Sequence, residues 1–203
     1  MGPVSIGLAV WFFAGKRYTP QGLGRLLLAM LLPLISALAY TLFRSPDLDS
    51  YEFNLLGNAA LTGGFGPNQV STAFGLGMFL SFYMWLNRMT LTGKRWLDLG
   101  IVLAFTFQGL FSFSRGGMIG GALGILVVVY FAFFGTYKSI ISRLVLKRIK
   151  KYVPWAVVVL LLAIFSANVI TDGKLFLRYQ GETPGTLAGS KERTLNTLTT
   201  DRL

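Results

Sequence analysis

Arg115 is the residue of this 203-residue chain whose surroundings most clearly indicate chemistry. It is the only charged residue among the 38 from position 99 to position 136, and two glycines follow it. An ionisable side chain within an apolar membrane segment is costly to retain and marks a functional site by default. A guanidinium also suits phosphate groups, because it binds them through paired hydrogen bonds. Arg115 and the adjacent Gly116 are therefore candidate ligands of an anion.

A second group of polar residues precedes the third apolar run of the chain. The sequence Gly-Gly-Phe-Gly-Pro67-Asn68-Gln69 supplies an adaptable turn, and Pro67 suits the first helical position because the N–H that it lacks is not needed there. Asn68 and Gln69 then lie in a first helical turn, where free N–H groups and the helix dipole attract anions. The sequence thus predicts two helix N-termini, two amides and Arg115 around one phosphate or diphosphate.

The C-terminal tail carries two further arginines, Arg178 and Arg193, either of which could lie over a bound diphosphate. Transfer chemistry would also need a base, yet the chain has no histidine and no cysteine. The glutamates of the tail, Glu182 and Glu192, lie in no sequence context that argues for this role. The acidic pair Asp47–Asp49 could hold a divalent metal, but we expect it to be solvated. No metal or other cofactor is expected if arginines neutralise the diphosphate.

Six apolar runs must position these residues. The chain is 53% hydrophobic and only 13% charged, whereas a soluble domain carries about 25% charged residues. Five of the runs have 17 or 18 residues, the lower end of what a membrane-spanning helix needs, and the first, with 11, is marginal. The runs are Val4–Ala14, Leu26–Phe43, Val70–Leu86, Trp96–Phe113, Met118–Phe134 and Val153–Ile170.

The segment around Arg115 must turn back on itself. As one helix, residues 99–136 would measure roughly 57 Å, whereas the hydrocarbon core of a bilayer is only about 30 Å thick. We place the corner at Ser114–Gly117, and expect the following glycines, Gly117 with Gly121 and Gly120 with Gly124, to permit close helix packing. The predicted fold is an all-α integral membrane protein of five to six transmembrane helices over residues 1–171. Residues 172–203 would begin a truncated periplasmic loop.

The charges indicate an orientation. Connections near residues 16–25, 88–95 and 138–151 hold 12 of the 19 basic residues and one acidic residue, Asp98. The remaining connections hold seven basic and seven acidic residues. The positive-inside rule places the first set in the cytoplasm, so that Arg115, Asn68 and the tail share the outer face. The net charge of +11 is divided by apolar runs, which argues for contact with membrane lipids and against nucleic acid.

These motifs together resemble the O-antigen ligase and O-antigen polymerase family, over roughly residues 40–203. The resemblance rests on Gly-Gly-Phe-Gly-Pro-Asn-Gln before an apolar run, Ser-Arg-Gly-Gly at a later outer corner, and an arginine-bearing outer tail. Family members are multi-pass glycosyltransferases of the GT-C kind in the bacterial inner membrane. They take a glycan from undecaprenyl diphosphate on the periplasmic face. Ligases transfer it to lipid A-core, and polymerases to a second lipid-linked glycan.

The resemblance implies roles for individual residues. Arg115 matches the first arginine that holds the donor diphosphate, and Arg193 is the preferred match for the second, ahead of Arg178. Asn68, Gln69 and Gly116 would complete the substrate site, with no metal. The family has a catalytic histidine farther along the periplasmic loop, and this chain contains none. We therefore expect a truncated member that is inactive by itself but keeps part of the donor-lipid site.

Other classes of protein remain open. A transporter or flippase for an anionic lipid would need polar groups at mid-membrane depth, and Gln108 is the strongest candidate for one. A non-catalytic scaffold subunit would explain the apolar runs but would leave Arg115 without a role. The sequence separates ligase from polymerase poorly, because both use the same donor.

Overall fold

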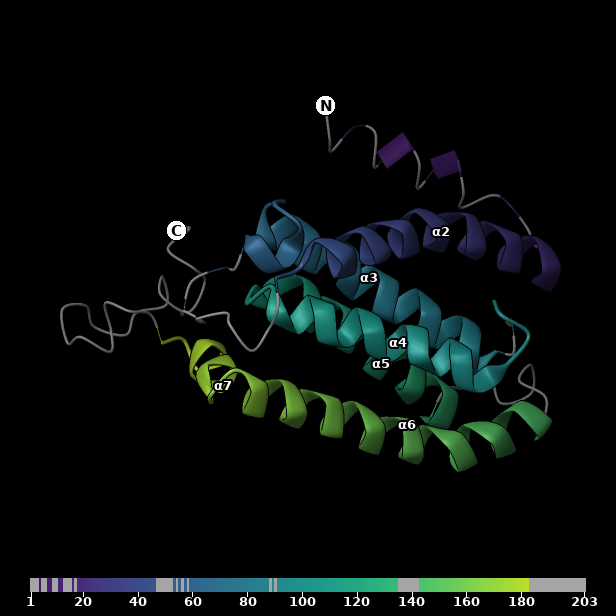
Figure 1. Cartoon of the computed structure of the whole chain (residues 1–203). Coiled ribbons are helices and arrows are strands. Elements are labelled where there is room, and N and C mark those ends of the chain that lie inside the picture. The colour runs from purple at the N-terminus through teal and green to yellow at the C-terminus, as the bar shows by residue number, and fades with distance from the viewer. Residues whose placement is uncertain are drawn as a thin grey trace.

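The computed structural model describes residues 18–46, 59–87, 91–134 and 143–182, together with residues 4, 7, 8, 11, 12, 16, 53, 55, 57 and 89. Within this part of the chain every regular element is a helix and there is no strand. The long helices lie alongside one another in a single bundle, as Figure 1 shows. The all-helical part of the predicted fold is therefore confirmed.

The helices follow the predicted apolar runs closely. Four of the runs with 17 or 18 residues each fall inside one long helix, and the run 96–113 outlasts its helix by two residues. Most of the run 4–14 lies outside the described residues. In order, the elements are α2 (Pro20–Arg44), the 3₁₀ helix η2 (Ala60–Thr62), α3 (Pro67–Leu86), α4 (Arg95–Phe111), α5 (Arg115–Phe134), α6 (Arg143–Ile170) and α7 (Lys174–Tyr179).

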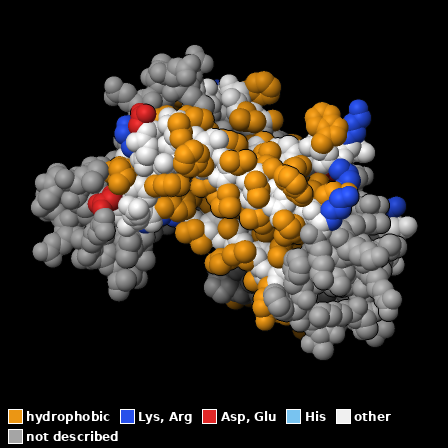
Figure 2. All heavy atoms as spheres, turned by 90° about the horizontal axis from the view of Figure 1, so that it is seen from below, with side chains coloured by type: hydrophobic (Ala, Val, Ile, Leu, Met, Phe, Trp, Pro, Cys, Tyr) orange, Lys and Arg blue, Asp and Glu red, His pale blue; other side chains and the backbone are white. Residues whose placement is uncertain are grey.

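Among the described residues, two helices are long and apolar enough to cross a membrane, by length and composition. They are residues Gln21–Arg44 of α2 and Lys151–Ile170 of α6, of whose most apolar stretches only 17% and 18% is buried inside the protein. Residues Arg115–Phe131 of α5 form a shorter apolar helix. Figure 2 shows hydrophobic side chains across the middle of one face, with Lys and Arg at one end and acidic beside basic residues at the other. Outward-facing apolar helices of this kind fit a lipid environment.

α3 is the central helix of the bundle. It packs against α2, α4 and α5, and 12 of its 20 residues are buried. Phe74 of α3 and Phe105 of α4 are almost fully buried and meet edge to face, with ring centroids 5.7 Å apart. α3 contains no charged residue and is buried against three neighbouring helices, whereas α2 and α6 leave most of their apolar stretches exposed.

α3 and α5 approach each other through glycines. A Cβ added at Gly75 of α3 would overlap the carbonyl of Gly117, and one added at Gly121 would overlap the carbonyl of Gly75. Gly124 lies against an aromatic ring of α3, whereas Gly120 faces open space. The predicted packing role is therefore confirmed for Gly117, Gly121 and Gly124. Gly120 takes no part in the contact.

Candidate functional site

The corner that holds Arg115 is a tight turn between α4 and α5. α4 ends at Phe111, and α5 begins at Arg115 itself. Between them, Phe113 has a φ of 55°, which is uncommon for a bulky side chain. Its ring is fully buried and stacks on Phe53, with centroids 5.9 Å apart. Burial thus holds the chain in the strained conformation that reverses its direction. The turn occupies residues 112–114, so only Ser114 of the predicted corner lies in it, and residues 115–117 already belong to α5.

Ser114 joins the two sequence motifs that were predicted to share a site. Its hydroxyl donates a hydrogen bond to Asn68 Oδ1 at 2.6 Å, and its carbonyl accepts one from the Ser71 hydroxyl at 2.7 Å. α3 begins at Pro67, so Asn68 and the exposed Gln69 lie in its first turn, as predicted. The N-termini of α3 and α5 are therefore linked directly beside Arg115.

Arg178 reaches the same corner from α7. Its Nε donates to the carbonyl oxygen of Phe113 at 3.4 Å, two residues before Arg115. Both arginines are buried, with exposed fractions of 5% for Arg178 and 9% for Arg115. Arg193, the preferred second arginine, lies outside the described residues, as do Glu192 and the pair Asp47–Asp49. Of the two tail arginines, Arg178 is the one that the structure places at the corner.

Side-chain caps hold α7 against the end of α6. Gly173 has a left-handed φ of 77° and turns the chain back after α6. The backbone N–H of Phe176 then donates to Asn168 Oδ1 at 3.0 Å, and that of Leu175 to Thr171 Oγ1 at 3.3 Å. These bonds satisfy N–H groups that a helix start leaves unpaired. They fix the direction in which α7 carries Arg178. Figure 1 shows α7 packed at the end of α6.

Tyr179 also belongs to the site, although nothing in its sequence context indicates this. Its hydroxyl is buried and has no hydrogen-bond partner among the residues that the structure describes. Burial raises the pKa of Tyr179 to about 12, and the positive charge of Arg115 lowers it by a smaller amount. Tyr179 is therefore a neutral phenol that interacts electrostatically with Arg115. Its hydroxyl proton is still available for a hydrogen bond.

The described carboxylates form no metal site. Within the described ranges, no group of three or more acidic residues could hold a metal ion. Glu182, one of the two tail glutamates considered as a base, is buried just beyond α7, with 7% of its surface exposed. Its backbone N–H donates to the carbonyl of Leu177 at 3.0 Å, which ends the short helix. The corner thus has the buried Arg115 and Arg178 among its charged groups, and the buried Glu182 follows at the end of α7.

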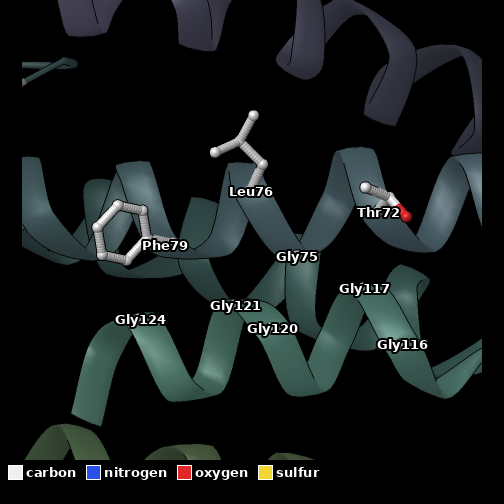
Figure 3. A pocket seen from close by; sticks show the side chains of 9 residues that line it. All are labelled: Thr72, Gly75, Leu76, Phe79, Gly116, Gly117, Gly120, Gly121 and Gly124. Carbon is white, nitrogen blue, oxygen red and sulfur yellow. The ribbon is translucent and has the colours of Figure 1, made fainter. Parts of the chain in front are cut away.

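A groove of about 420 Å³ lies between α3 and α5 and reaches the corner at Gly116. Figure 3 shows the glycines of α5 beside the segment of α3 that carries Thr72, Leu76 and Phe79. A Cβ at Gly116 would meet nothing within 4 Å. The side of Gly116 that would carry a Cβ is therefore open to a ligand.

Gln108, the polar residue considered for transport, is bonded within the protein. Its Nε2 donates to the carbonyl oxygen of Leu61 at 2.6 Å and to Ser45 Oγ at 3.0 Å. Gln108 lies in the last turn of α4, near the corner rather than at the middle of the bundle. The NH₂ group of its amide thus ties η2 and the end of α2 to α4.

The site as a whole suits an anion with more than one negative charge. Arg115 and Arg178 supply two guanidinium groups, and the starts of α3 and α5 add the positive ends of two helix dipoles. Comparisons of the chain with models of protein families, with curated proteins and with solved structures found no match. What the site does must therefore be argued from its own residues.

Proposed function

We propose that the chain is part of a membrane glycosyltransferase of surface-polysaccharide assembly, similar to O-antigen ligases. It would transfer a glycan from undecaprenyl diphosphate to lipid A-core at the periplasmic face of the bacterial inner membrane. The observation that carries the proposal is the 2.6 Å hydrogen bond from Ser114 to Asn68. It joins two of the three motifs on which the resemblance rests and sets two helix N-termini beside Arg115.

The reaction gives the cationic corner its role. An acceptor hydroxyl attacks the anomeric carbon of the donor sugar, and the bond from that carbon to the diphosphate oxygen breaks. The departing diphosphate gains negative charge, which Arg115, Arg178 and the N-terminus of α5 would stabilise. The proton of the acceptor hydroxyl passes to a base. Because the chain contains no histidine, we expect it to bind the donor lipid without transferring the glycan.

The groove between α3 and α5 supports a lipid-linked donor. It begins at Gly116, next to Arg115, and continues along α5 as far as Gly124, with Leu76 and Phe79 among its walls. A diphosphate at the corner would leave its polyprenyl chain beside this apolar surface. In this proposal α3, α4 and α5 cross the membrane together with α2 and α6. Five described helices and the segment 4–14 would then make the expected five to six spans.

The alternatives differ in how well the structure supports them. An O-antigen polymerase would use the same donor and the same corner, with a second lipid-linked glycan as acceptor. An anionic-lipid flippase has less support, because the NH₂ group of Gln108 is bonded to Leu61 and Ser45. A scaffold without a ligand would leave the groove at Gly116 without a role.

Direct binding of undecaprenyl diphosphate tests the proposal. The 203-residue chain in phosphatidylcholine nanodiscs is titrated with this lipid, and Arg115→Ala is compared with Arg44→Ala, an exposed arginine at the end of α2. Loss of a charge-assisted contact is worth about 1.5–3 kcal/mol, so Arg115→Ala should weaken binding by about tenfold or more. Arg44→Ala should leave it nearly unchanged. Equal binding by both variants would remove Arg115 from the site.

A further inference from the structure

A second cavity, of about 440 Å³, lies among the ends of α2, α4 and α6 and beside η2. Leu42, Ser45, Phe107, Gln108 and Ile170 are among its lining residues. It shares no lining residue with the groove between α3 and α5. The proposed transfer reaction gives this cavity no role.

The amide of Gln108 presents an unused acceptor at this cavity. The side chain is only 4% exposed. Because the carbonyl of Leu61 can only accept a hydrogen bond, the NH₂ group of Gln108 must face it, at 2.6 Å. Ser45 accepts the second N–H at 3.0 Å and donates its own proton to the carbonyl of Thr41. Oε1 therefore points away from Leu61, and it accepts no hydrogen bond from any residue that the structure describes.

This acceptor is open to a donor from outside the described residues. Gln108 Oε1 is not among the described side-chain atoms that are both buried and without a partner, and ligand sites typically combine apolar walls with a few accessible polar groups. None of the described residues lining the cavity is charged. A charged ligand would therefore find no opposite charge there. A neutral hydroxyl is the donor that this lining favours.

The remaining walls suit the carbon face of a hydroxylated ligand. The rings of Phe107 and Phe111 lie 6.2 Å apart between centroids, tilted by 42°, and both line the cavity. Leu42 and Ile170 are 51% and 43% exposed, so the cavity opens to its surroundings between α2 and α6. The C–H face of a sugar or polyol packs well on aromatic and aliphatic side chains while its hydroxyls bond at the edge.

We propose that this cavity binds a neutral, hydroxyl-rich ligand of sugar or polyol chemistry. One ligand hydroxyl donates to Gln108 Oε1, and the carbon face of the ligand packs on Phe107 and Phe111. Such a ligand has two possible sources, a glycan or the sugar headgroup of a membrane lipid. The inference does not depend on the diphosphate function, because binding is read without donor lipid and without transfer.

An occluding substitution tests the site without disturbing Gln108. Replacing Gln108 itself would also break its bonds to Leu61 and Ser45, so Leu42→Trp is used to fill the cavity from its mouth. Leu32→Trp is the matched control, because Leu32 is 53% exposed on the same helix and does not line the cavity. One probe is methyl β-glucoside, observed by saturation-transfer NMR with the chain in phosphatidylcholine nanodiscs. The other is monoglucosyl diacylglycerol, detected by native mass spectrometry.

Wild type and Leu32→Trp should bind at least one probe, and Leu42→Trp should weaken that binding by about tenfold or more. Binding of the soluble glucoside would identify a glycan site. Binding of the glucolipid alone would identify a lipid headgroup site. The inference is overturned if wild type binds neither probe, or if Leu42→Trp and Leu32→Trp bind equally well. Either result leaves the undecaprenyl diphosphate titration untouched, so the two proposals fail separately.

Discussion

At the corner, two arginines from distant parts of the sequence are both buried. Arg115 begins α5, while Arg178 arrives from the short α7 and donates to the carbonyl of Phe113. Burying cationic groups is costly unless hydrogen bonds or opposite charges compensate them. Both arginines already have partners within the protein, and in the proposed function a diphosphate would add to these contacts.

Tyr179 provides a test of this environment through its titration. Because burial raises its pKa to about 12, the phenol of Tyr179 should remain neutral well above pH 10. We expect the difference in phenolate absorbance between wild type and Tyr179→Phe to develop near pH 12. A difference that titrates near pH 10 would show that the hydroxyl is not buried as described.

The raised pKa of Tyr179 also predicts how the stability of the fold depends on pH. A phenol whose pKa is higher in the folded protein stabilises the fold fully below pH 10, and this contribution disappears as the pH rises through 12. The rise in the pKa of Tyr179 from 10.0 to about 12 corresponds to at most about 3 kcal/mol of unfolding free energy. Between pH 10 and 12, the unfolding free energy of the wild type should therefore fall more than that of Tyr179→Phe.

Local patterns predicted the positions of some site residues but not of others. Pro67, Asn68 and Arg115 begin helices, and helix starts carry signals in neighbouring residues. Tyr179 and Phe113 acquire their roles only when α7 and the α4–α5 turn pack together. No spacing along the chain encodes such a contact, so sequence analysis did not identify either residue.

The contact between α3 and α5 depends on the absence of side chains at specific glycines. In Gly121→Ala the added methyl group would overlap the backbone carbonyl of Gly75, whereas in Gly120→Ala it would meet nothing within 4 Å. Overpacking of this kind costs about 1–3 kcal/mol. Gly121→Ala should therefore lower the unfolding free energy in a denaturing-detergent titration, while Gly120→Ala should not. A comparable loss in both variants would argue against the described contact.

Hydropathy located the helices better than it located their ends. α5 starts three residues before its apolar run, and α6 starts ten residues before its own, at Arg143. The basic segment 143–152 is therefore part of one helix that continues through Pro154. Hydropathy reports the apolar portion of a helix, whereas turns and caps decide where it begins and ends. α4 stops at Phe111 because the next residues form the strained turn.

Across the bundle, charge and apolar surface are segregated. Hydrophobic side chains occupy the middle of the face seen in Figure 2, and charged residues lie at both ends. The ends of α2 and α4 meet where Gln108 bonds to Ser45, and Ser114 bonds to Asn68 just beyond the end of α4, where α3 and α5 begin. Ile170, the last residue of α6, lines the same cavity as Gln108. The corner, α7 and the cavity of Gln108 thus share one end. The orientation of that end in the membrane decides which ligands can reach all three.

Single-cysteine labelling shows on which side of the membrane Gly116 lies, and the chain has no native cysteine to interfere. Gly116→Cys places a thiol at the corner, where the space is open, and Lys94→Cys places an exposed control thiol just before α4. A membrane-impermeant maleimide is applied to intact spheroplasts and then to permeabilised ones.

If the corner lies on the outer face, the maleimide should react with Gly116→Cys in intact spheroplasts and with Lys94→Cys only after permeabilisation. Added undecaprenyl diphosphate should slow the reaction of Gly116→Cys. A thiol at position 116 that reacts only after permeabilisation, or that the lipid leaves unprotected, would contradict a diphosphate site on the outer face.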